Sequence, residues 1–151
     1  MKLTTKGRFA VTAMLDIALH KPEEYVSIAA IGERRHLSSA YLEQIFGKLR
    51  RAGLLEGVRG PAGGYRLARP AEQITVMQIL EAVDAALEKS VCDKRRPTCD
   101  GEGECITFDL WDSLNREMHR FLNGITLKSL ADQKKLKDQG VHPISIIKQK
   151  A

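Results

Sequence analysis

The segment LSSAYLEQIFGKLRRAGLLEGVRGPAGGYRLAR, residues 37–69, holds the clearest structural signals in the chain. Ser38 is a residue type that caps a helix N-terminus, and Gly53 is suited to end the helix. Between them, apolar residues recur at the spacing of one buried helix face, at Leu42, Ile45, Phe46 and Leu49. Burial does not explain the composition of the outward face, which carries Ser39, Tyr41, Glu43, Gln44, Lys48, Arg50 and Arg51.

A short β-hairpin is predicted directly after this helix. Residues 54–58 and 65–68 read as two short strands, and RGPAGG, residues 59–64, has the Gly and Pro of a tight loop. The loop has little side-chain bulk and a single arginine, Arg59. This combination suits insertion of Arg59 into a narrow minor groove of DNA.

Further helices are predicted on both sides of this block. One begins near Thr4 and a second at Ser27, and Thr75 with Gln78 forms a capping box that opens another helix after the hairpin. Three helices followed by a basic hairpin is the order of a winged helix-turn-helix. We therefore predict a mainly α fold with a small β-hairpin, in which residues 1–90 form a DNA-binding domain.

Basic residues are concentrated where the third helix and the hairpin are predicted. The chain has a net charge of +5, yet residues 34–69 hold eight Lys or Arg and only two acids. This excess suits a polyanion such as double-stranded DNA, although a solvated face of an ordinary amphipathic helix is the alternative. In the major groove, Gln44 has a good length for adenine, and Glu43 can accept a hydrogen bond from cytosine.

A long amphipathic helix is predicted from residue 107 to Asn123, and its apolar stripe is wide for so short a chain. The stripe comprises Leu110, Trp111, Leu114, Met118, Phe121 and Leu122. Packing against a second copy would bury it, and a homodimer would match a pseudo-palindromic DNA site; folding back onto its own domain is the alternative. We assign residues 107–130 to this dimerisation helix and a short following helix, and residues 131–151 to a flexible tail.

All three cysteines lie in one segment, residues 91–106, at Cys92, Cys99 and Cys105. An odd number of closely spaced thiols argues against a secreted disulfide framework, and no apolar run is long enough to span a membrane, so we expect a cytoplasmic protein. The spacing does not match the C-x₂-C pairs of a zinc ribbon. Soft thiolates select zinc, copper(I) or iron–sulphur clusters, and spacing alone does not choose among these.

The chain resembles the iron–sulphur cluster regulator (IscR) family in LTTKGRFAVTAMLDIAL (residues 3–19), in the block at 37–69 and in the three-cysteine segment before LW. The resemblance implies a dimeric winged-helix transcription factor that represses the genes of iron–sulphur cluster assembly. It also implies a [2Fe–2S] cluster held by three cysteines and one histidine, with Cys92, Cys99 and Cys105 as the cysteine ligands here.

The resemblance further implies which residues meet DNA. By this likeness, Tyr41, Glu43 and Gln44 would read bases, and Arg59 and Gly60 would enter the minor groove. The full set that we expect to contact DNA is Ser38, Ser39, Tyr41, Glu43, Gln44, Lys48, Arg50, Arg59, Gly60 and Pro61.

The sequence departs from the family pattern at Phe108, where the family has its histidine ligand. Phenylalanine cannot bind metal, so the fourth ligand is open. Asp109 lies four residues after Cys105, one helical turn on, and is the first candidate; Glu102 and Glu104 are others. Loss of the histidine leaves a [4Fe–4S] cluster as an alternative to [2Fe–2S].

Other functions remain open at this point. A nitric-oxide- or iron-responsive regulator of the same family, or a winged-helix regulator with zinc or no metal, would keep the DNA-binding features. A redox carrier or thiol enzyme would need neither the polar third helix nor the Gly-rich hairpin. The sequence has no nucleophile–base pair, and RGPAGGY lies in a hairpin rather than between a strand and a helix, so we predict that the protein is not an enzyme.

Overall fold

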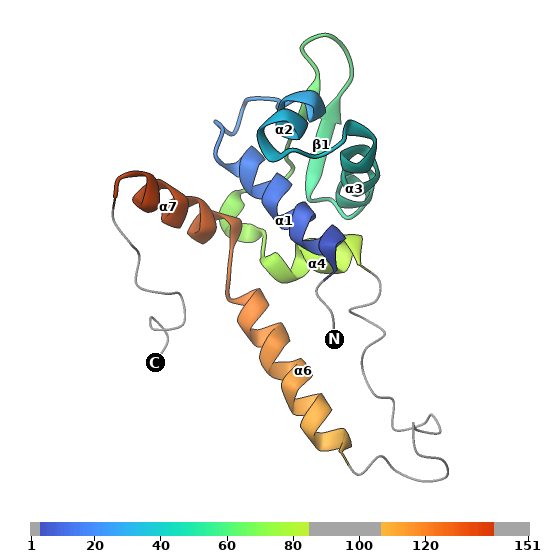
Figure 1. Cartoon of the computed structure of the whole chain (residues 1–151), viewed down its shortest axis with the longest axis vertical. Helices are drawn as coiled ribbons and strands as arrows, with labels where there is room; N and C mark the ends of the chain where they lie inside the picture. The colour runs from blue at the N-terminus through green and yellow to red at the C-terminus, as the bar shows by residue number, and fades with distance from the viewer. Residues whose placement is uncertain (1–3, 85–106, 141–151) are drawn as a thin grey trace.

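Helices and one hairpin follow one another in the order that the sequence predicts (Figure 1). The structure is a computed structural model that describes residues 4–84 and 107–140. The predicted mainly α fold with a small β-hairpin is confirmed. The elements are α1 (Thr5–Ala18), α2 (Ile28–Arg35), α3 (Ser39–Arg51), β1 (Leu55–Val58), β2 (Gly64–Leu67), the 3₁₀ turn η1 (Ala71–Gln73), α4 (Val76–Val83), α6 (Phe108–Asn123) and α7 (Leu127–Asp138).

The apolar face of α3 forms the centre of the core, as its spacing predicts. Its side chains at Leu42, Ile45, Phe46 and Leu49 are fully buried. Burying each such side chain contributes about 1.5–3 kcal/mol. The ring of Phe46 meets that of Tyr65 on β2 edge to face, with centroids 4.9 Å apart. The core therefore fixes one face of α3 against the hairpin and leaves the opposite face outside.

Side-chain caps begin the helices at the residues that the sequence indicates. Ser27 accepts a hydrogen bond from the Ala30 amide, and Ser38 from the Tyr41 amide. At α4, Thr75 and Gln78 form the predicted reciprocal capping box, with distances of 3.1 and 3.2 Å. These bonds satisfy amides that a helix start would leave unpaired.

The turn between α2 and α3 is tight. His36 ends α2 in the left-handed region, with φ of 55°, which is uncommon for a residue with a side chain. The amides of His36 and Leu37 both donate to the carbonyl of Gly32. A Cβ on Gly32 would lie 2.6 Å from the Leu37 carbonyl oxygen, so this approach requires glycine.

The hairpin is tied to the segment before α2. β1 and β2 pair antiparallel with Glu56 opposite Arg66, and Val26 makes a further bridge to Tyr65 through two backbone hydrogen bonds of 2.9 Å. A Cβ on Gly64 would lie 2.5 Å from the Val26 carbonyl oxygen, so glycine allows this close approach. Two four-residue strands thus gain a third backbone partner.

One buried charge joins α1 to α2. Asp16 is 2% exposed, and its two carboxylate oxygens lie 2.6 Å from Arg34 Nη2 and from Arg35 Nη2. Burial opposes ionisation of this carboxyl and is the largest single effect, but the hydrogen bonds and charges of the two arginines together outweigh it and lower the pKa of Asp16. Asp16 is therefore ionised in the folded protein.

The C-terminal helix corrects the predicted tail. We expected a short helix to residue 130 and a flexible tail from 131, but α7 continues to Asp138. Its start is fixed by a Thr126–Ser129 capping box and by a backbone bridge between Thr75 and Thr126. Leu127 is fully buried in the core, and α7 packs on α1. Residues 131–138 are thus part of a folded helix; residues 141–151 lie outside the described chain.

Acid should weaken the tie between α1 and α2. Because the pKa of Asp16 is lowered by folding, its stabilising effect is complete above about pH 4, its ordinary value, and is lost as pH falls through the lowered pKa. We predict that Asp16→Asn costs about 2–3 kcal/mol of unfolding free energy at pH 7, as expected for hydrogen bonds to a charged group. Urea unfolding across pH would show the difference from wild type shrinking below about pH 4.

The matched control is Asp132→Asn, which breaks an exposed Lys128–Asp132 pair on α7. Exposed pairs of this kind contribute little, so this variant should unfold at the same urea concentration as wild type, both near pH 7 and below about pH 4. Equal unfolding free energies for the two variants would show that Asp16 does not tie the helices.

Candidate nucleic-acid interface

The outward face of α3 is open to solvent along its first two turns. Ser39, Glu43 and Gln44 are exposed, and so is Arg50 near the C-terminal end. None of the hydrogen bonds or ion pairs within the described chain uses the side chains of these four residues. The face thus offers an amide, a carboxylate, a hydroxyl and a guanidinium, the groups that distinguish base edges and bind phosphates.

Tyr41 is held differently from its neighbours on α3. Its side chain is half-buried, and its ring meets Phe9 of α1 edge to face, with centroids 5.9 Å apart. An aromatic pair of this kind adds to stability beyond simple burial. Tyr41 therefore packs α3 against α1, and the part of its ring that stays exposed is what remains for DNA.

Lys48 has a partner inside the protein. Its Nζ donates to the carbonyl oxygen of Val83, the last residue of α4, at 3.1 Å. Carbonyls at a helix C-terminus lack intrahelical partners, so an ammonium group placed there is favourable. The side chain that we expected to contact DNA thus links α3 to the end of α4.

The hairpin loop is narrow and exposed at its tip. Arg59, Gly60 and Pro61 are all exposed, and the loop stands out from the end of the molecule beside α3 (Figure 1). Gly60 has a φ of 119°, which a residue with a side chain rarely adopts, and its carbonyl accepts a hydrogen bond from the Gly63 amide at 2.9 Å. This turn presents Arg59 on a loop of small residues.

The structure divides the basic residues that the sequence groups together. Arg34 and Arg35 bind Asp16, and Arg66 pairs with Glu56. Within the described chain, no ion pair involves Arg50, Arg51 or Arg59, and all three are exposed. The local excess of six charges therefore overstates the cations that are available to DNA, which lie on α3 and at the hairpin tip.

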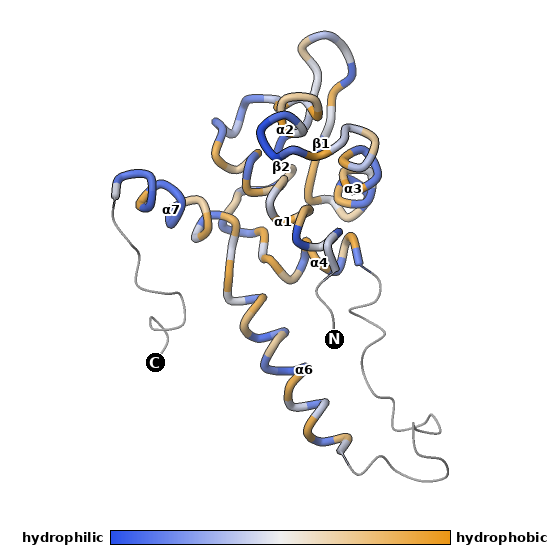
Figure 2. The backbone as a smooth tube through the Cα atoms, viewed as in Figure 1, coloured by the Kyte–Doolittle hydropathy of each residue, from blue (hydrophilic) through white to orange (hydrophobic). Residues whose placement is uncertain are grey.

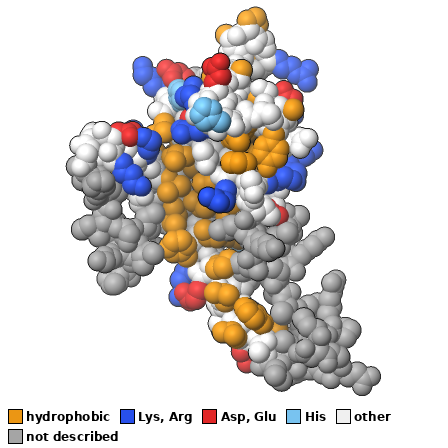
Figure 3. All heavy atoms as spheres, in the orientation of Figure 1, with side chains coloured by type: hydrophobic (Ala, Val, Ile, Leu, Met, Phe, Trp, Pro, Cys, Tyr) orange, Lys and Arg blue, Asp and Glu red, His pale blue; other side chains and the backbone are white. Residues whose placement is uncertain are grey.

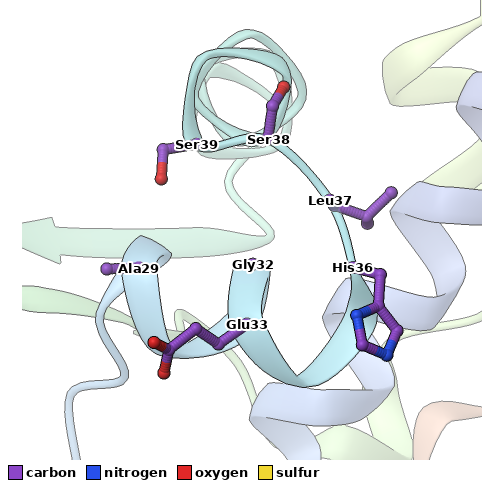
Figure 4. Close-up of a pocket in the computed structure, with 7 residues that line it drawn as sticks. All are labelled: Ala29, Gly32, Glu33, His36, Leu37, Ser38 and Ser39. Atoms are coloured by element: carbon purple, nitrogen blue, oxygen red, sulfur yellow. The ribbon is translucent and has the colours of Figure 1, made fainter.

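A shallow hollow lies at the helix-turn-helix corner (Figure 4). It is lined by Ala29, Gly32, Glu33, His36, Leu37, Ser38 and Ser39. In the close-up, Glu33 and Ser39 point out from α2 and α3, and Gly32 lies on α2 between them. A carboxylate here disfavours a phosphate close to it, so this corner adds no positive charge to the surface that would meet DNA.

Of the residues proposed as metal ligands, only Asp109 lies within the described part of the chain. Cys92, Cys99 and Cys105, with Glu102 and Glu104, lie outside the described residues. Over residues 4–84 and 107–140, no three His, Cys, Asp or Glu side chains come together as a metal site. Asp109 is exposed in the first turn of α6, next to half-buried Phe108.

The described histidines are engaged elsewhere. His20 bonds the Asp16 carbonyl oxygen through Nδ1 at 2.8 Å, and His36 ends α2. His119 lies 4.0 Å from Glu81 of α4, near the C-terminal end of α6. Among the described carboxylates, Asp109 is the nearest in sequence to Cys105.

α6 extends away from the winged domain with an apolar stripe in the open (Figures 1 and 2). None of its residues is fully buried within the chain. The large side chains on the stripe are exposed by 60% at Leu110, 49% at Trp111, 44% at Leu114 and 48% at Phe121. Figure 3 shows hydrophobic side chains along this arm and up onto the domain. Such a continuous apolar surface marks an interaction site.

The C-terminal part of the stripe does meet the chain's own domain. Met118 and Leu122 are half-buried, and Leu122 packs on a small cluster of Val76, Leu80 and Ile125. Folding back onto the chain's own domain is therefore realised at one end of the stripe, which contacts α4, and the rest is uncovered in a single chain. No helix in the described part of the chain is long and apolar enough to cross a membrane.

Comparison with known proteins agrees with this arrangement. The model of the Rrf2 family, described as an iron-dependent transcriptional regulator, matches residues 3–133. The chain is 48% identical to the HTH-type transcriptional regulator IscR of Vibrio atlanticus over 145 residues, which cover 96% of this chain and 80% of the relative.

Solved structures agree with the sequence comparison. The IscR of T. potens is 35% identical and superposes with a TM-score of 0.71, over 92% of this chain and 88% of that one. CymR, the global cysteine regulator of B. subtilis, is 30% identical with a TM-score of 0.72, over 87% of this chain and 97% of that one.

Lys48 and Arg50 should differ in how their replacement affects DNA binding. We predict that Lys48→Met leaves the salt dependence of binding unchanged, because its ammonium group is bound to Val83. Arg50→Met should reduce the slope of log affinity against log salt by about 0.9 for each phosphate that the guanidinium neutralises in the wild type. Fluorescence anisotropy with one duplex over a salt series measures both. If Lys48→Met lowers the slope as much as Arg50→Met, Lys48 contacts phosphate instead.

Proposed function

The chain belongs to the Rrf2 family of iron-dependent transcriptional regulators, and on that premise we propose that it is a homodimeric repressor that senses iron–sulphur clusters. It is a DNA-binding transcription regulator, similar over most of its length to IscR proteins. The observation that carries the proposal is the three-thiol segment placed between a winged DNA-binding domain and an exposed apolar helix. Its expected targets are cluster-assembly genes, and a regulator of bacterial chromosomal DNA acts in the cytoplasm.

DNA reading is assigned to α3 and the hairpin tip. Gln44 can bond adenine in two places, and Glu43 can accept from cytosine N4 while repelling phosphates at sequences that do not offer that donor. Ser38 and Ser39 stand at the start of α3, the end that helix-turn-helix proteins turn toward base edges. Arg59, supported by Gly60 and Pro61, would enter the minor groove beside the site.

The residues present fit an iron–sulphur cluster. Thiolates are the ligands that such clusters take, and the chain supplies Cys92, Cys99 and Cys105. Phe108 cannot serve as the fourth ligand, whereas Asp109 offers an exposed carboxylate in the first turn of α6. When bound, the cluster supplies a redox-active centre whose presence reports the supply of iron and sulphide. We favour [2Fe–2S], with [4Fe–4S] as the second candidate.

Chemical analysis of the purified protein tests the cluster. Isolated without oxygen, it should contain iron and acid-labile sulphide in equal amounts and absorb broadly in the visible range. Serine at Cys92, Cys99 or Cys105 should abolish both, because each removes a thiolate. Asp109→Ala should speed loss of the visible absorption in air, while Asp112→Ala, one turn further along, should not.

Other results of the metal analysis would point to a different function. Zinc in place of iron and sulphide, or no metal after reconstitution, would leave a winged-helix regulator without cluster sensing. Nitric oxide that bleaches the cluster and releases DNA, at oxygen levels that the cluster survives, would identify a nitric-oxide sensor of the same family. Unchanged DNA affinity between loaded and cluster-free protein would remove the sensing function.

A second copy of the chain is the proposed partner of α6. Two copies of the stripe would bury Leu110, Trp111, Leu114 and Phe121 in an isologous contact, and the paired domains would match a pseudo-palindrome. A suitable duplex can be obtained without knowing the promoter, by selection from random-sequence DNA with the wild-type protein. A selected consensus without two-fold symmetry would contradict a dimeric reader.

Charge placed on the stripe should separate the two copies. We predict that Leu114→Asp is monomeric by sedimentation equilibrium and binds the selected duplex at least about a hundredfold more weakly, because avidity is lost. Ser113→Asp adds the same charge at an exposed position outside the stripe and should remain dimeric. A Leu114→Asp protein that stays dimeric would place the interface elsewhere.

A further inference from the structure

Arg66 contacts two other segments of the chain, β1 and the segment before α2. On β2 it stands opposite Glu56 of β1 in the strand register, and the two side chains form an ion pair. Its guanidinium also lies over the ring of Tyr25, 4.8 Å from the centroid. One side chain therefore contacts both its neighbouring strand and the segment that precedes α2.

Those contacts occur where the hairpin needs support. An isolated two-stranded hairpin is marginally stable at best. Tyr25 is adjacent to Val26, whose backbone bridges Tyr65 through two hydrogen bonds. Arg66 thus adds side-chain contacts to the same three-segment arrangement and ties it together from the solvent side. Phe46 holds Tyr65 from the core side.

We propose that Arg66 is a positioning residue of the wing: paired with Glu56 and stacked on Tyr25, it holds the hairpin so that its tip is ready for DNA. This inference rests on the proposed contact of Arg59 with the minor groove. A hairpin fixed before binding loses less conformational entropy when it docks, so the brace increases affinity without touching DNA. The charge of Arg66 is used within the protein.

The pKa of Arg66 and the lack of an ion pair at Arg59 within the described residues agree with different roles for the two arginines. The hydrogen bond to Glu56 raises the pKa of Arg66, so the guanidinium is better stabilised where it is than in water. Arg59 has no ion-pair partner among the described residues. The two arginines of the hairpin therefore differ in role: Arg59 is exposed at the tip, and Arg66 is engaged near the base.

Removing Glu56 gives a test in which the two roles of Arg66 predict opposite signs. Glu56→Ala makes the protein more positive by one charge and frees Arg66. If Arg66 contacts phosphate, or simply attracts DNA, affinity rises. If Arg66 positions the wing, affinity for the selected duplex falls by up to about fivefold, the range expected for loss of a cross-strand pair while the contact with Tyr25 remains.

The measurement uses the full chain and the duplex selected with the wild type, at about 0.3 M salt, where long-range attraction is screened. Asp132→Ala is the matched control, because it removes an exposed acid from an ion pair on α7 and makes the same change in charge. Its affinity should equal that of wild type. Amide exchange of the hairpin in the free protein should quicken in Glu56→Ala and stay unchanged in the control.

Substitutions at Arg66 complete the test. Arg66→Leu should weaken binding as Glu56→Ala does, with the slope against salt unchanged, and Arg66→Lys should recover part of the affinity. A slope reduced by about 0.9 per protomer in Arg66→Leu would show a phosphate contact and overturn the proposal. So would Glu56→Ala affinity equal to or above that of wild type.

Arg59→Ala distinguishes failure of the role proposed for Arg66 from failure of the proposed contact between the wing and DNA. If Arg59→Ala weakens binding and neither Glu56→Ala nor Arg66→Leu does, the wing contacts DNA but needs no brace, and the inference fails alone. If Arg59→Ala also has no effect, the proposed wing contact fails, and the role of Arg66 fails with it.

Discussion

The carboxylate of Asp16, buried between two arginines, sets the geometry on which the DNA-binding face depends. Arg34 and Arg35 lie at the end of α2, and both bond to this one side chain of α1. Only residues 36–38 separate α2 from α3, so a fixed end of α2 also fixes the start of α3. An apolar contact could hold α1 and α2 together, but two directed ion pairs also fix how α2 is rotated relative to α1. The angle at which α3 is presented follows from this contact together with the packing of its apolar face.

Features that depend on neighbouring residues could be predicted from the sequence, whereas contacts between side chains far apart in the sequence could not. The caps at Ser27, Ser38 and Thr75 act over three residues, and the apolar face of α3 repeats within four turns. By contrast, Asp16 and Arg34 are 18 residues apart, and Lys48 and Val83 are 35 apart. Nothing in the composition of residues 34–69 distinguishes an arginine that binds an internal carboxylate from one that is exposed. The charge pattern therefore indicates where basic residues gather, but not how many of them have partners inside the protein.

The length of α7 was underestimated for a related physical reason. Its apolar residues are sparse among lysines, so periodicity gave little signal. Its start is also anchored through the backbone: the Val76 amide donates to the Ile125 carbonyl, and the Leu127 amide to the Ile74 carbonyl, both at 2.9 Å. Hydrogen bonds of this kind are open to almost any residue and leave no pattern in the side chains. For the candidate site, exposure along α3 was predictable from its period, but the internal engagement of Tyr41 and Lys48 was not.

The same backbone hydrogen bonds determine how α6 would act in the proposed dimer. α6 runs for 16 residues, about 24 Å, and its C-terminal end is fixed to the start of α4 through Ile125, Leu127 and the Thr75–Thr126 bridge. A helix held firmly at one end acts as a lever, so a small change of direction there becomes a large displacement at the other end. Two such levers, paired along their apolar stripes, would set the separation of the two α3 helices. The three cysteines precede the N-terminal end of α6 in the sequence, and a cluster held there together with Asp109 would act on the first turn of the helix. A cluster in that place can bias the spacing of the reading helices only if it binds more tightly at one spacing than at another.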